Sequence, residues 1–210
     1  MKGCTMERQE LFDLIYKVNA WGSSESRSGA GSTLAATEHI RRELPALFSN
    51  FGVKSILDIP CGDMNWISKI LNPELNYIGA DIVGDLIDQN KRNYPNLDFR
   101  LLDIINSDLP EVDLIICRDC FFHFPLELIF EALRNIKRSK SKYLLTTHFV
   151  WRTRKNINID LGKFFAVNFR LEPFNFPAPL ETIIEGNSEW EPHLGTQKDR
   201  SLSLWRICDI

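Results

Sequence analysis

The stretch SILDIPCGDMNW, residues 55–66, indicates how this chain folds. It begins as an apolar, β-rich run and ends in a turn around Gly62, which is typical of a buried strand that leads into a ligand-binding loop. Such loops usually carry three glycines when they hold a dinucleotide, because the backbone must approach a pyrophosphate. Here Pro60 and Met64 stand where two of the glycines would be. The pattern therefore predicts a loop for a cofactor that lacks phosphates.

From residue 53 onward, short β-rich runs alternate with helical patterns. Strands are expected at residues 53–59, 76–82, 97–103, 112–118 and 142–149, and helices at 64–71, 85–93 and 125–136. Strands that are separated by helices form right-handed βαβ units, so the sequence predicts an α/β fold whose parallel sheet has helices on both faces. Two further strand-like runs, residues 169–177 and 200–210, are expected to form a terminal antiparallel pair.

The N-terminal part, residues 1–52, has a different pattern. Apolar residues at helical spacing predict one amphipathic helix around residues 11–18 and another over residues 34–51. The Ser- and Gly-rich run between them, residues 21–33, is expected to be a loop. We expect the 210 residues to form a single domain, in which residues 53–210 are the α/β core.

Composition narrows the classes of partner and compartment. The formal net charge of −3 gives the chain no general attraction to nucleic acid or to anionic membranes. No apolar run approaches the roughly 18 residues of a membrane-spanning helix, and the N-terminus lacks the apolar region of a secretory signal. The five cysteines are scattered and odd in number, which indicates free thiols. We therefore expect a cytoplasmic protein with no nucleic-acid or membrane partner; its oligomeric state is left open.

Carboxylates stand at or beside the ends of the first four predicted strands, at Asp58, Asp81, Asp103 and Asp119. In an open α/β sheet, ligands bind outside the carboxyl ends of the strands. Asp81 follows the glycine turn by about 20 residues, the spacing at which an acid binds ribose hydroxyls. Asp103 is placed to accept a hydrogen bond from an adenine amino group. S-adenosylmethionine (SAM) has an adenosine and an amino acid but no phosphate, so it suits this pattern better than NAD.

Several runs resemble the motifs of a known family. The segments ILDIPCGD, YIGADIV, LLDI and DLIICRDCFFHFP resemble motifs one to four of the class I SAM-dependent methyltransferases, over roughly residues 50–150. This resemblance implies a Rossmann-like, mostly parallel seven-stranded sheet with a C-terminal antiparallel strand pair. The variant DIPCGDMNW, together with SGAGST, TTHF and FNFPAPLE, resembles a subgroup from bacteria and large algal viruses. That subgroup implies O-methylation of a sugar hydroxyl, on a deoxy-sugar such as the terminal rhamnose of a glycan.

The resemblance also implies roles for individual residues. Asp58 and Gly62 would shape the methionine end of the SAM site, and Asp81 would hold the ribose. Ile82 would pack on the adenine, and Asp103 would meet its amino group. The complete set of residues expected to bind the cofactor is Arg27, Asp58, Pro60, Cys61, Gly62, Asp81, Ile82, Asp103, Ile104 and Arg118.

Two arginines and two segments outside the strands are also expected to contribute to the site. Arg118, which ends the fourth strand, would face the methyl-transfer centre. Arg27 and the N–H groups of the loop 21–33 either bind the cofactor carboxylate and cover the site, or belong to a flexible connector. The run WRTRK, residues 151–155, is either an acceptor-facing segment or a solvated loop.

A hydroxyl acceptor needs a general base, because it is a poor nucleophile at neutral pH. Asp119 is the first candidate, since it leaves a strand end beside the expected methyl group. His123 and His148 are the second candidates, and both are equally compatible with buried core histidines.

The alternatives concern the acceptor and metal ions. The run CRDC, residues 117–120, has no second cluster to complete a zinc site, so no metal is expected there. A metal-assisted reaction stays open, because Asp119 and Asp160 could share a cation. A small-molecule or protein acceptor and a non-catalytic SAM-binding module also remain as alternatives.

Overall fold

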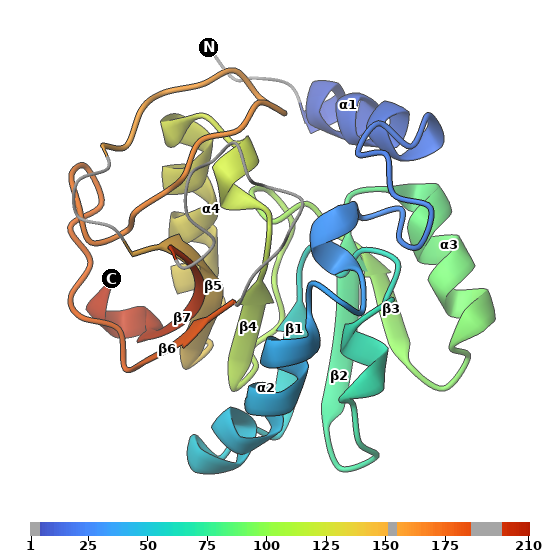
Figure 1. Ribbon diagram of the computed structural model, residues 1–210, viewed down its shortest axis with the longest axis horizontal. Coiled ribbons are helices and arrows are strands. Elements are labelled where there is room, and N and C mark those ends of the chain that lie inside the picture. Colours follow the sequence, from blue (N-terminus) through green and yellow to red (C-terminus); the bar gives the residue numbers. More distant parts are fainter. Residues whose placement is uncertain (1–4, 151–154, 186–198) are drawn as a thin grey trace.

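The structure, a computed structural model, describes residues 5–150, 155–185 and 199–210. Its centre is a seven-stranded sheet with the order β3-β2-β1-β4-β5-β7-β6 (Figure 1). The strands from β3 to β5 pair in parallel, and β7 runs antiparallel to both of its neighbours. This confirms the expected mostly parallel sheet with an antiparallel C-terminal pair. The strands are β1 (Ser55–Asp58), β2 (Asn76–Asp81), β3 (Asp98–Leu101), β4 (Leu114–Cys117), β5 (Tyr143–Phe149), β6 (Glu181–Ile184) and β7 (Arg200–Arg206).

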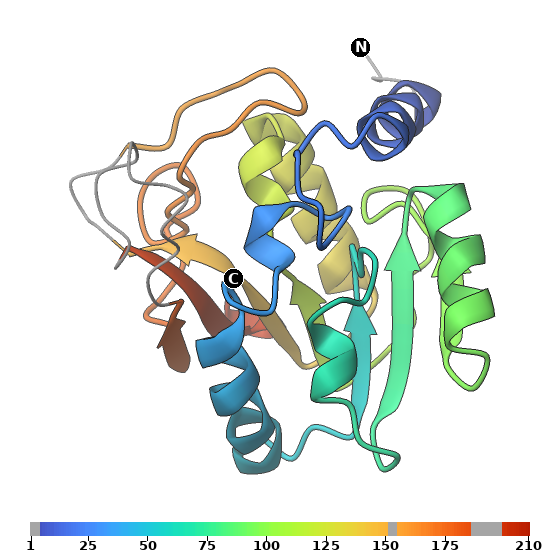
Figure 2. The ribbon, with the colours of Figure 1, turned by 45° about the vertical axis from the view of Figure 1, so that its right-hand side comes forward.

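Helices cover both faces of the sheet, as Figures 1 and 2 show. Alternate residues of a strand point to opposite faces, so Ile56 of β1 packs in the cluster of α2 (Glu38–Asn50), and Leu57 packs in the cluster of α4 (Leu126–Arg138). Both side chains are fully buried. Each such burial stabilises the fold by about 1.5–3 kcal/mol, which is why these short strands are specified by nearly continuous apolar runs.

Two further helices lie at the edge of this arrangement. The helix α3 (Gly84–Asn93) follows β2 and packs against β2 and β3. The helix α1 (Thr5–Lys17) packs beyond the carboxyl ends of the central strands, away from the layers formed by α2 and α4 (Figure 2). The second N-terminal helix begins at Glu38, later than the apolar pattern from residue 34 predicts, because residues 34–37 form turns.

The helix predicted at residues 64–71 is wrong. Only the three-residue 3-10 helix Ile67–Lys69 forms there. The preceding loop has left-handed backbone at Gly62 and Met64, with φ of 56° and 64°. A right-handed helix therefore cannot begin until after Met64. Pro73 then prevents a helix from continuing, which leaves room for less than two turns.

The strand predicted at residues 169–177 is also wrong. This segment is irregular, and its apolar residues pack as an aromatic cluster in which the rings of Phe169 and Phe176 stack at 5.0 Å. Pro173 and Pro177 have no N–H groups for a strand ladder, and this favours the irregular path. The partner of β7 is instead β6, which begins after these prolines.

One carboxylate ties together the amino ends of three strands. Asp113 accepts hydrogen bonds from the amides of Lys54 and Ser55, both at 3.0 Å, and pairs with the Lys142 ammonium at 2.5 Å. Burial acts to raise the pKa of Asp113, but the ammonium and the amides outweigh burial and lower this pKa to about 2. The stabilisation is therefore present above the unfolded-state pKa of about 3.9 and is lost as the pH falls from about 4 to about 2.

We therefore expect Asp113→Ala to lower the free energy of unfolding by about 1–3 kcal/mol at pH 7. Asp98→Ala is the matched control, because Asp98 forms only an exposed ion pair with Arg100 and should cost less than about 1 kcal/mol. Urea unfolding at pH 7 and pH 3 measures both effects. A cost for Asp113→Ala that is the same at both pH values would contradict this assignment.

Candidate active site

A cavity of about 400 Å³ lies at the carboxyl ends of the central strands. Its walls come from the ends of β1, β2 and β3, from α1, from the loop 21–33 and from residues 118–124. Most of the predicted site residues line it together: Arg27, Asp58, Pro60, Cys61, Gly62, Asp81, Ile82, Asp103, Ile104, Arg118, Asp119 and His123. This is the volume class of small-molecule and cofactor sites.

The glycine loop after β1 has little capacity left for phosphate. The amide of Cys61 donates to a carbonyl of β2 at 2.8 Å, and the amide of Gly62 donates to the Asp81 carboxylate at 3.2 Å. The amide of Asp63 donates to the Ser28 hydroxyl at 3.0 Å. Pyrophosphate loops work by aiming free amides at the ligand. A loop whose amides already have partners, beside several carboxylates, fits a cofactor without phosphates.

Met64 explains how the loop manages with one glycine fewer. It adopts left-handed backbone, a conformation that costs a non-glycine residue roughly 1–2 kcal/mol. Its side chain is almost completely buried, and the Tyr77 hydroxyl oxygen lies 3.1 Å from its sulfur. Burial of the side chain offsets the backbone strain, which explains how a methionine is accommodated at this left-handed position.

Two buried carboxylates face the cavity from adjacent strand ends. Asp58 is 2% exposed and accepts a hydrogen bond from the Tyr77 hydroxyl at 2.7 Å. Burial raises the pKa of Asp58 to about 7. Burial also raises the pKa of Asp81 to about 6, against the lowering effect of the amides of Val83 and Gly62. Hydroxyl donors or a cation would satisfy these carboxylates, whereas a phosphate would be repelled. The ribose hydroxyls and positive charges of SAM therefore fit this end of the cavity.

The third acid is held by a residue that the sequence patterns did not single out. Arg8 of α1 donates to Asp103 at 2.8 Å, and both residues are buried. A weak signal was available, because Arg8, Phe12 and Tyr16 recur every four residues and so share one face of the helix. All three line the cavity.

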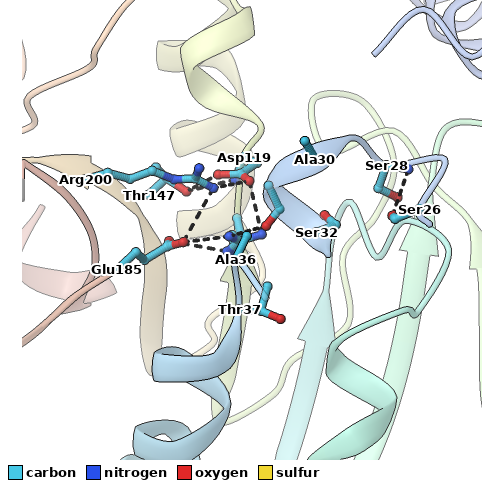
Figure 3. A network of polar contacts seen from close by, with 12 residues as sticks. Ser26, Ser28, Ala30, Ser32, Ala36, Thr37, Asp119, Thr147, Glu185 and Arg200 are labelled. Carbon is cyan, nitrogen blue, oxygen red and sulfur yellow. Dashed lines mark hydrogen bonds and ion pairs between the residues drawn. The ribbon is translucent and has the colours of Figure 1, made fainter. Parts of the chain in front are cut away.

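Beside the expected methyl-transfer end lies a largely buried cluster of four charged residues, three of which, Asp119, Glu185 and Arg200, are labelled in Figure 3. Arg118 pairs with Glu185 at 2.6 Å and with Asp119 at 3.1 Å, and it also donates to the Gly31 carbonyl at 2.8 Å. Arg200 pairs with Asp119 and contacts Glu185 at 3.5 Å. The sequence patterns missed Glu185 and Arg200, because nothing local shows that β6 and β7 carry charges to the end of β4.

This cluster argues against Asp119 as the base. Burial acts to raise the pKa of Asp119, but Arg118 and Arg200 outweigh burial and hold it below the usual value. The Thr147 hydroxyl also donates to the carboxylate, at 3.0 Å. A carboxylate stabilised as an anion by two guanidinium groups is a weak proton acceptor. The structure thus places Asp119 at the cavity as expected, paired with two guanidinium groups.

His123 has the geometry of a base. Its Nδ1 lies 2.9 Å from the Lys163 carbonyl, which can only accept, so Nδ1 carries the proton and Nε2 has the lone pair. Its ring stacks on Trp21 with centroids 5.6 Å apart. Burial lowers the pKa of His123, which keeps the imidazole neutral at pH 7. Both rings line the cavity.

His148, the third candidate base, does not line the cavity. It is 2% exposed, accepts a hydrogen bond from the Phe169 amide at 3.2 Å, and packs edge-on against Trp205. Burial and the nearby Arg170 lower the pKa of His148 to about 4. The expectation of a catalytic role is therefore corrected: side chains alternate along β5, and His148 points to the face opposite Thr147, into the aromatic core.

The loop 21–33 is anchored to the glycine loop and forms part of the cavity wall. The Asp63 carboxylate accepts from the Ser26 hydroxyl at 3.0 Å and from the Arg27 amide at 2.7 Å. The Arg27 guanidinium lies over the Tyr16 ring at 5.7 Å and donates to the Tyr16 carbonyl. These contacts favour the covering role over the flexible connector.

The remaining predictions are placed as follows. Among the described residues, Cys61, Cys117 and Cys120 are buried free thiols, and no group of three His, Cys, Asp or Glu side chains is arranged to hold a metal ion. Most of the run WRTRK, residues 151–154, lies outside the described residues. Within the part of the chain that the structure describes, no helix is long and apolar enough to cross a membrane.

Comparisons with known proteins support a methyltransferase. Residues 56–141 match the family described as "Methyltransferase domain". The chain is 25% identical over 190 residues to "Putative methyltransferase 235L" of Invertebrate iridescent virus 6, an alignment that covers 84% of this chain and 68% of that relative.

Solved structures share the fold. Magnesium protoporphyrin IX methyltransferase from Synechocystis PCC 6803 with bound SAM has a TM-score of 0.62 at 11% identity, over 98% of this chain and 99% of that chain. N-methyltransferase NodS from Bradyrhizobium japonicum WM9 has a TM-score of 0.52 at 13% identity, over 81% of this chain and 98% of that chain. The matched methyltransferase core and the shared fold support a SAM-dependent methyltransferase with a Rossmann-like fold.

Proposed function

We propose that this methyltransferase transfers the methyl group of SAM to a sugar hydroxyl, on a deoxy-sugar such as rhamnose within a glycan. The observation that carries the proposal is His123, a neutral imidazole at the cavity wall whose Nε2 is available as a base. A hydroxyl acceptor needs such a base, since its proton must leave as the oxygen attacks. A neutral amine is a stronger nucleophile and can lose its proton after the attack, so it depends less on a base.

The chemistry of the walls near His123 supports a neutral, partly apolar acceptor. Trp21, Phe122 and Phe164 line the cavity there. Flat aromatic faces pack well against the C–H faces of sugars, and the methyl group of a deoxy-sugar extends that apolar surface. The four charges around Arg118 compensate one another, so they offer no net charge to attract a charged acceptor.

In this proposal the chain positions the reactants and manages one proton. When bound, SAM supplies a methyl group already activated by its sulfonium. Asp81 orients the cofactor through the ribose hydroxyls, and Asp58 faces its positively charged end. The wall around Trp21 holds the acceptor oxygen at the near-attack distance of about 3–3.5 Å. His123 takes the hydroxyl proton on Nε2, and the Lys163 carbonyl stabilises the imidazolium through Nδ1.

Methyl-labelled SAM and a set of rhamnose-terminated glycans test the acceptor. The expected product is a methyl ether, which survives mild base, whereas a methyl ester would release methanol under the same treatment. Matched glycans whose candidate hydroxyl is replaced by hydrogen should take up no label. Label that appears only on non-sugar small molecules or on proteins would overturn the sugar assignment. SAM binding without transfer to any acceptor would favour the non-catalytic module.

The raised pKa of Asp58 predicts that SAM binding depends on pH. Its carboxyl has a pKa of about 7, so less than half of the protein carries the ionised Asp58 below pH 7. The ionised form is the one that favours a cationic ligand. The apparent affinity scales with the fraction in the competent form. We therefore expect the affinity for SAM to rise about tenfold between pH 6 and pH 8.

Calorimetric titration at several pH values measures this dependence. S-adenosylhomocysteine (SAH) is the control ligand, because it lacks the sulfonium charge and should show a weaker dependence. Asp58→Asn is the control variant and should remove most of the dependence for SAM. Equal pH profiles for SAM and SAH, or an unchanged profile in the variant, would show that Asp58 is not the group involved.

A further inference from the structure

The N-terminal helix α1 forms part of the wall at one end of the cavity. Arg8, Phe12 and Tyr16 all line the cavity from one face of this helix. The Tyr16 hydroxyl donates to Gln89 of α3 at 2.8 Å, and the Phe12 ring packs on Phe124 at 6.2 Å. Figure 2 shows α1 beyond the arrowheads of the central strands. The helix therefore belongs to the cavity wall, although it lies outside the layers that cover the sheet.

Arg8 is the most deeply buried of these three residues. It is 4% exposed and pairs at 2.8 Å with Asp103, which is 7% exposed and lies 95 residues away in the chain. The other oxygen of Asp103 accepts from the Ile105 amide at 2.9 Å. The Asn106 amide also donates to this carboxylate, at 3.4 Å. A carboxylate offers about four lone-pair positions, so these three bonds leave Asp103 with about one position for a ligand. A buried ion pair of this kind is costly to form unless its polar groups are well satisfied.

The guanidinium decides which hydrogen bonds Asp103 can make. Both oxygens of Asp103 already accept hydrogen bonds, one from the Arg8 guanidinium and one from the Ile105 amide, so the carboxylate presents acceptors to a ligand. The 6-amino group of adenine is a donor and matches this preference. A 6-oxo purine presents an acceptor at the same position, so two acceptors would face each other in a buried site. Sites that discriminate in this way reject the mismatched group strongly, because the buried polar atoms are left unpaired.

We infer that Arg8 is a cofactor-specificity residue, which through Asp103 makes the base end of the cavity an acceptor-only site that selects a 6-amino over a 6-oxo purine. The N-terminal helix is thus part of the cofactor-recognition machinery. The inference rests on the SAM cofactor and is independent of the proposed sugar acceptor. Arg8 acts through Asp103, so it is a positioning residue and not a catalytic one.

Calorimetry of the full chain with SAH and with S-inosylhomocysteine, its 6-oxo counterpart, tests the inference at pH 7.5. We expect the wild type to prefer SAH by at least about 100-fold. Arg8→Ala removes the guanidinium and opens space beside Asp103, where a water can donate to a 6-oxo group. The preference for SAH should therefore fall at least about tenfold. Arg8→Lys keeps the positive charge and should keep most of the preference.

Two controls separate recognition from structural support. Phe12→Ala loosens the same helix without touching the ion pair, so it should weaken both ligands by the same factor. In Asp103→Asn the side-chain amide offers both a donor and an acceptor. This variant should therefore bring the ratio of the affinities for SAH and S-inosylhomocysteine near one. A wild type without preference, or an Arg8→Ala protein that weakens both ligands equally, would overturn the inference. If Arg8→Ala does not fold, Arg8→Lys and Asp103→Asn still decide it, because unchanged ratios in both would refute the role of the pair.

Discussion

Replacing His123 by glutamine is expected to lower turnover by about 10²–10⁴-fold, while the affinity for SAM stays within about twofold of the wild type. Glutamine keeps a polar side chain of similar reach, so it can still contact the Lys163 carbonyl. It cannot accept the acceptor's proton, because an amide has no basic nitrogen. The loss should therefore appear in kcat, with little change in cofactor binding.

The pH profile gives a second measurement of the same residue. Burial lowers the pKa of His123, so the neutral, basic form dominates at pH 7. Activity should rise with pH through this lowered pKa and level off near neutrality. The His123→Gln protein should lack this rise. His39→Gln on the surface of α2 is the matched control and should keep the wild-type rate. A His123→Gln protein with wild-type kcat would remove His123 as the base.

Gly62→Ala is expected to lower the affinity for SAM by roughly 30- to 5000-fold, the equivalent of about 2–5 kcal/mol. Gly62 has a φ of 56°, a conformation that costs an alanine about 1–2 kcal/mol. A Cβ atom at this position would also lie 2.2 Å from the Ser28 hydroxyl oxygen. The Ser28 hydroxyl accepts a hydrogen bond from the Asp63 amide. If Ser28 moves to relieve the overlap, the loop that shapes the cavity moves with it. Overpacking of this kind adds about 1–3 kcal/mol.

Two further variants separate backbone strain from overlap. Gly52→Ala has a similar φ of 62° but no atom within 4 Å of the new Cβ, so it should lower stability by about 1–2 kcal/mol and leave SAM binding unchanged. The double variant Gly62→Ala with Ser28→Ala removes the hydroxyl oxygen and should recover part of the lost affinity. Calorimetry and urea unfolding measure the two effects. Equal effects of Gly62→Ala and Gly52→Ala on SAM affinity would contradict the role of the overlap.

The sequence predicted the sheet because local patterns control it. The buried strands β1 and β4 are mostly apolar runs. Asp58 ends β1 and Asp119 follows β4 by two residues, and the sheet topology brings both acids to one edge. The same logic correctly brought Asp58 and Asp81 to one cavity. Local patterns failed at residues 64–71, where the helical spacing competes with a loop that needs left-handed backbone at Met64.

The parts of the site that could not be predicted depend on long-range contacts. Arg8 reaches Asp103 across 95 residues, and Glu185 reaches Arg118 across 67 residues. No spacing rule connects such positions. His123 and His148 look alike in the sequence. His123 lies shortly after β4 and His148 lies near the end of β5, and each has a phenylalanine next to it. Only the direction of each side chain, into the cavity for His123 and into the core for His148, separates a base from a packing residue.

Calorimetric titration of the wild type and of Asp81→Ala with SAM tests the central claim, that the single-glycine loop and the acids at the strand ends form a SAM site. The Asp81 carboxylate accepts the Gly62 amide at 3.2 Å and is placed to receive the ribose hydroxyls. We predict binding in the micromolar range for the wild type and a loss of at least about 100-fold for the variant. No binding of SAM by the wild type, or equal affinities for the two proteins, would contradict the account.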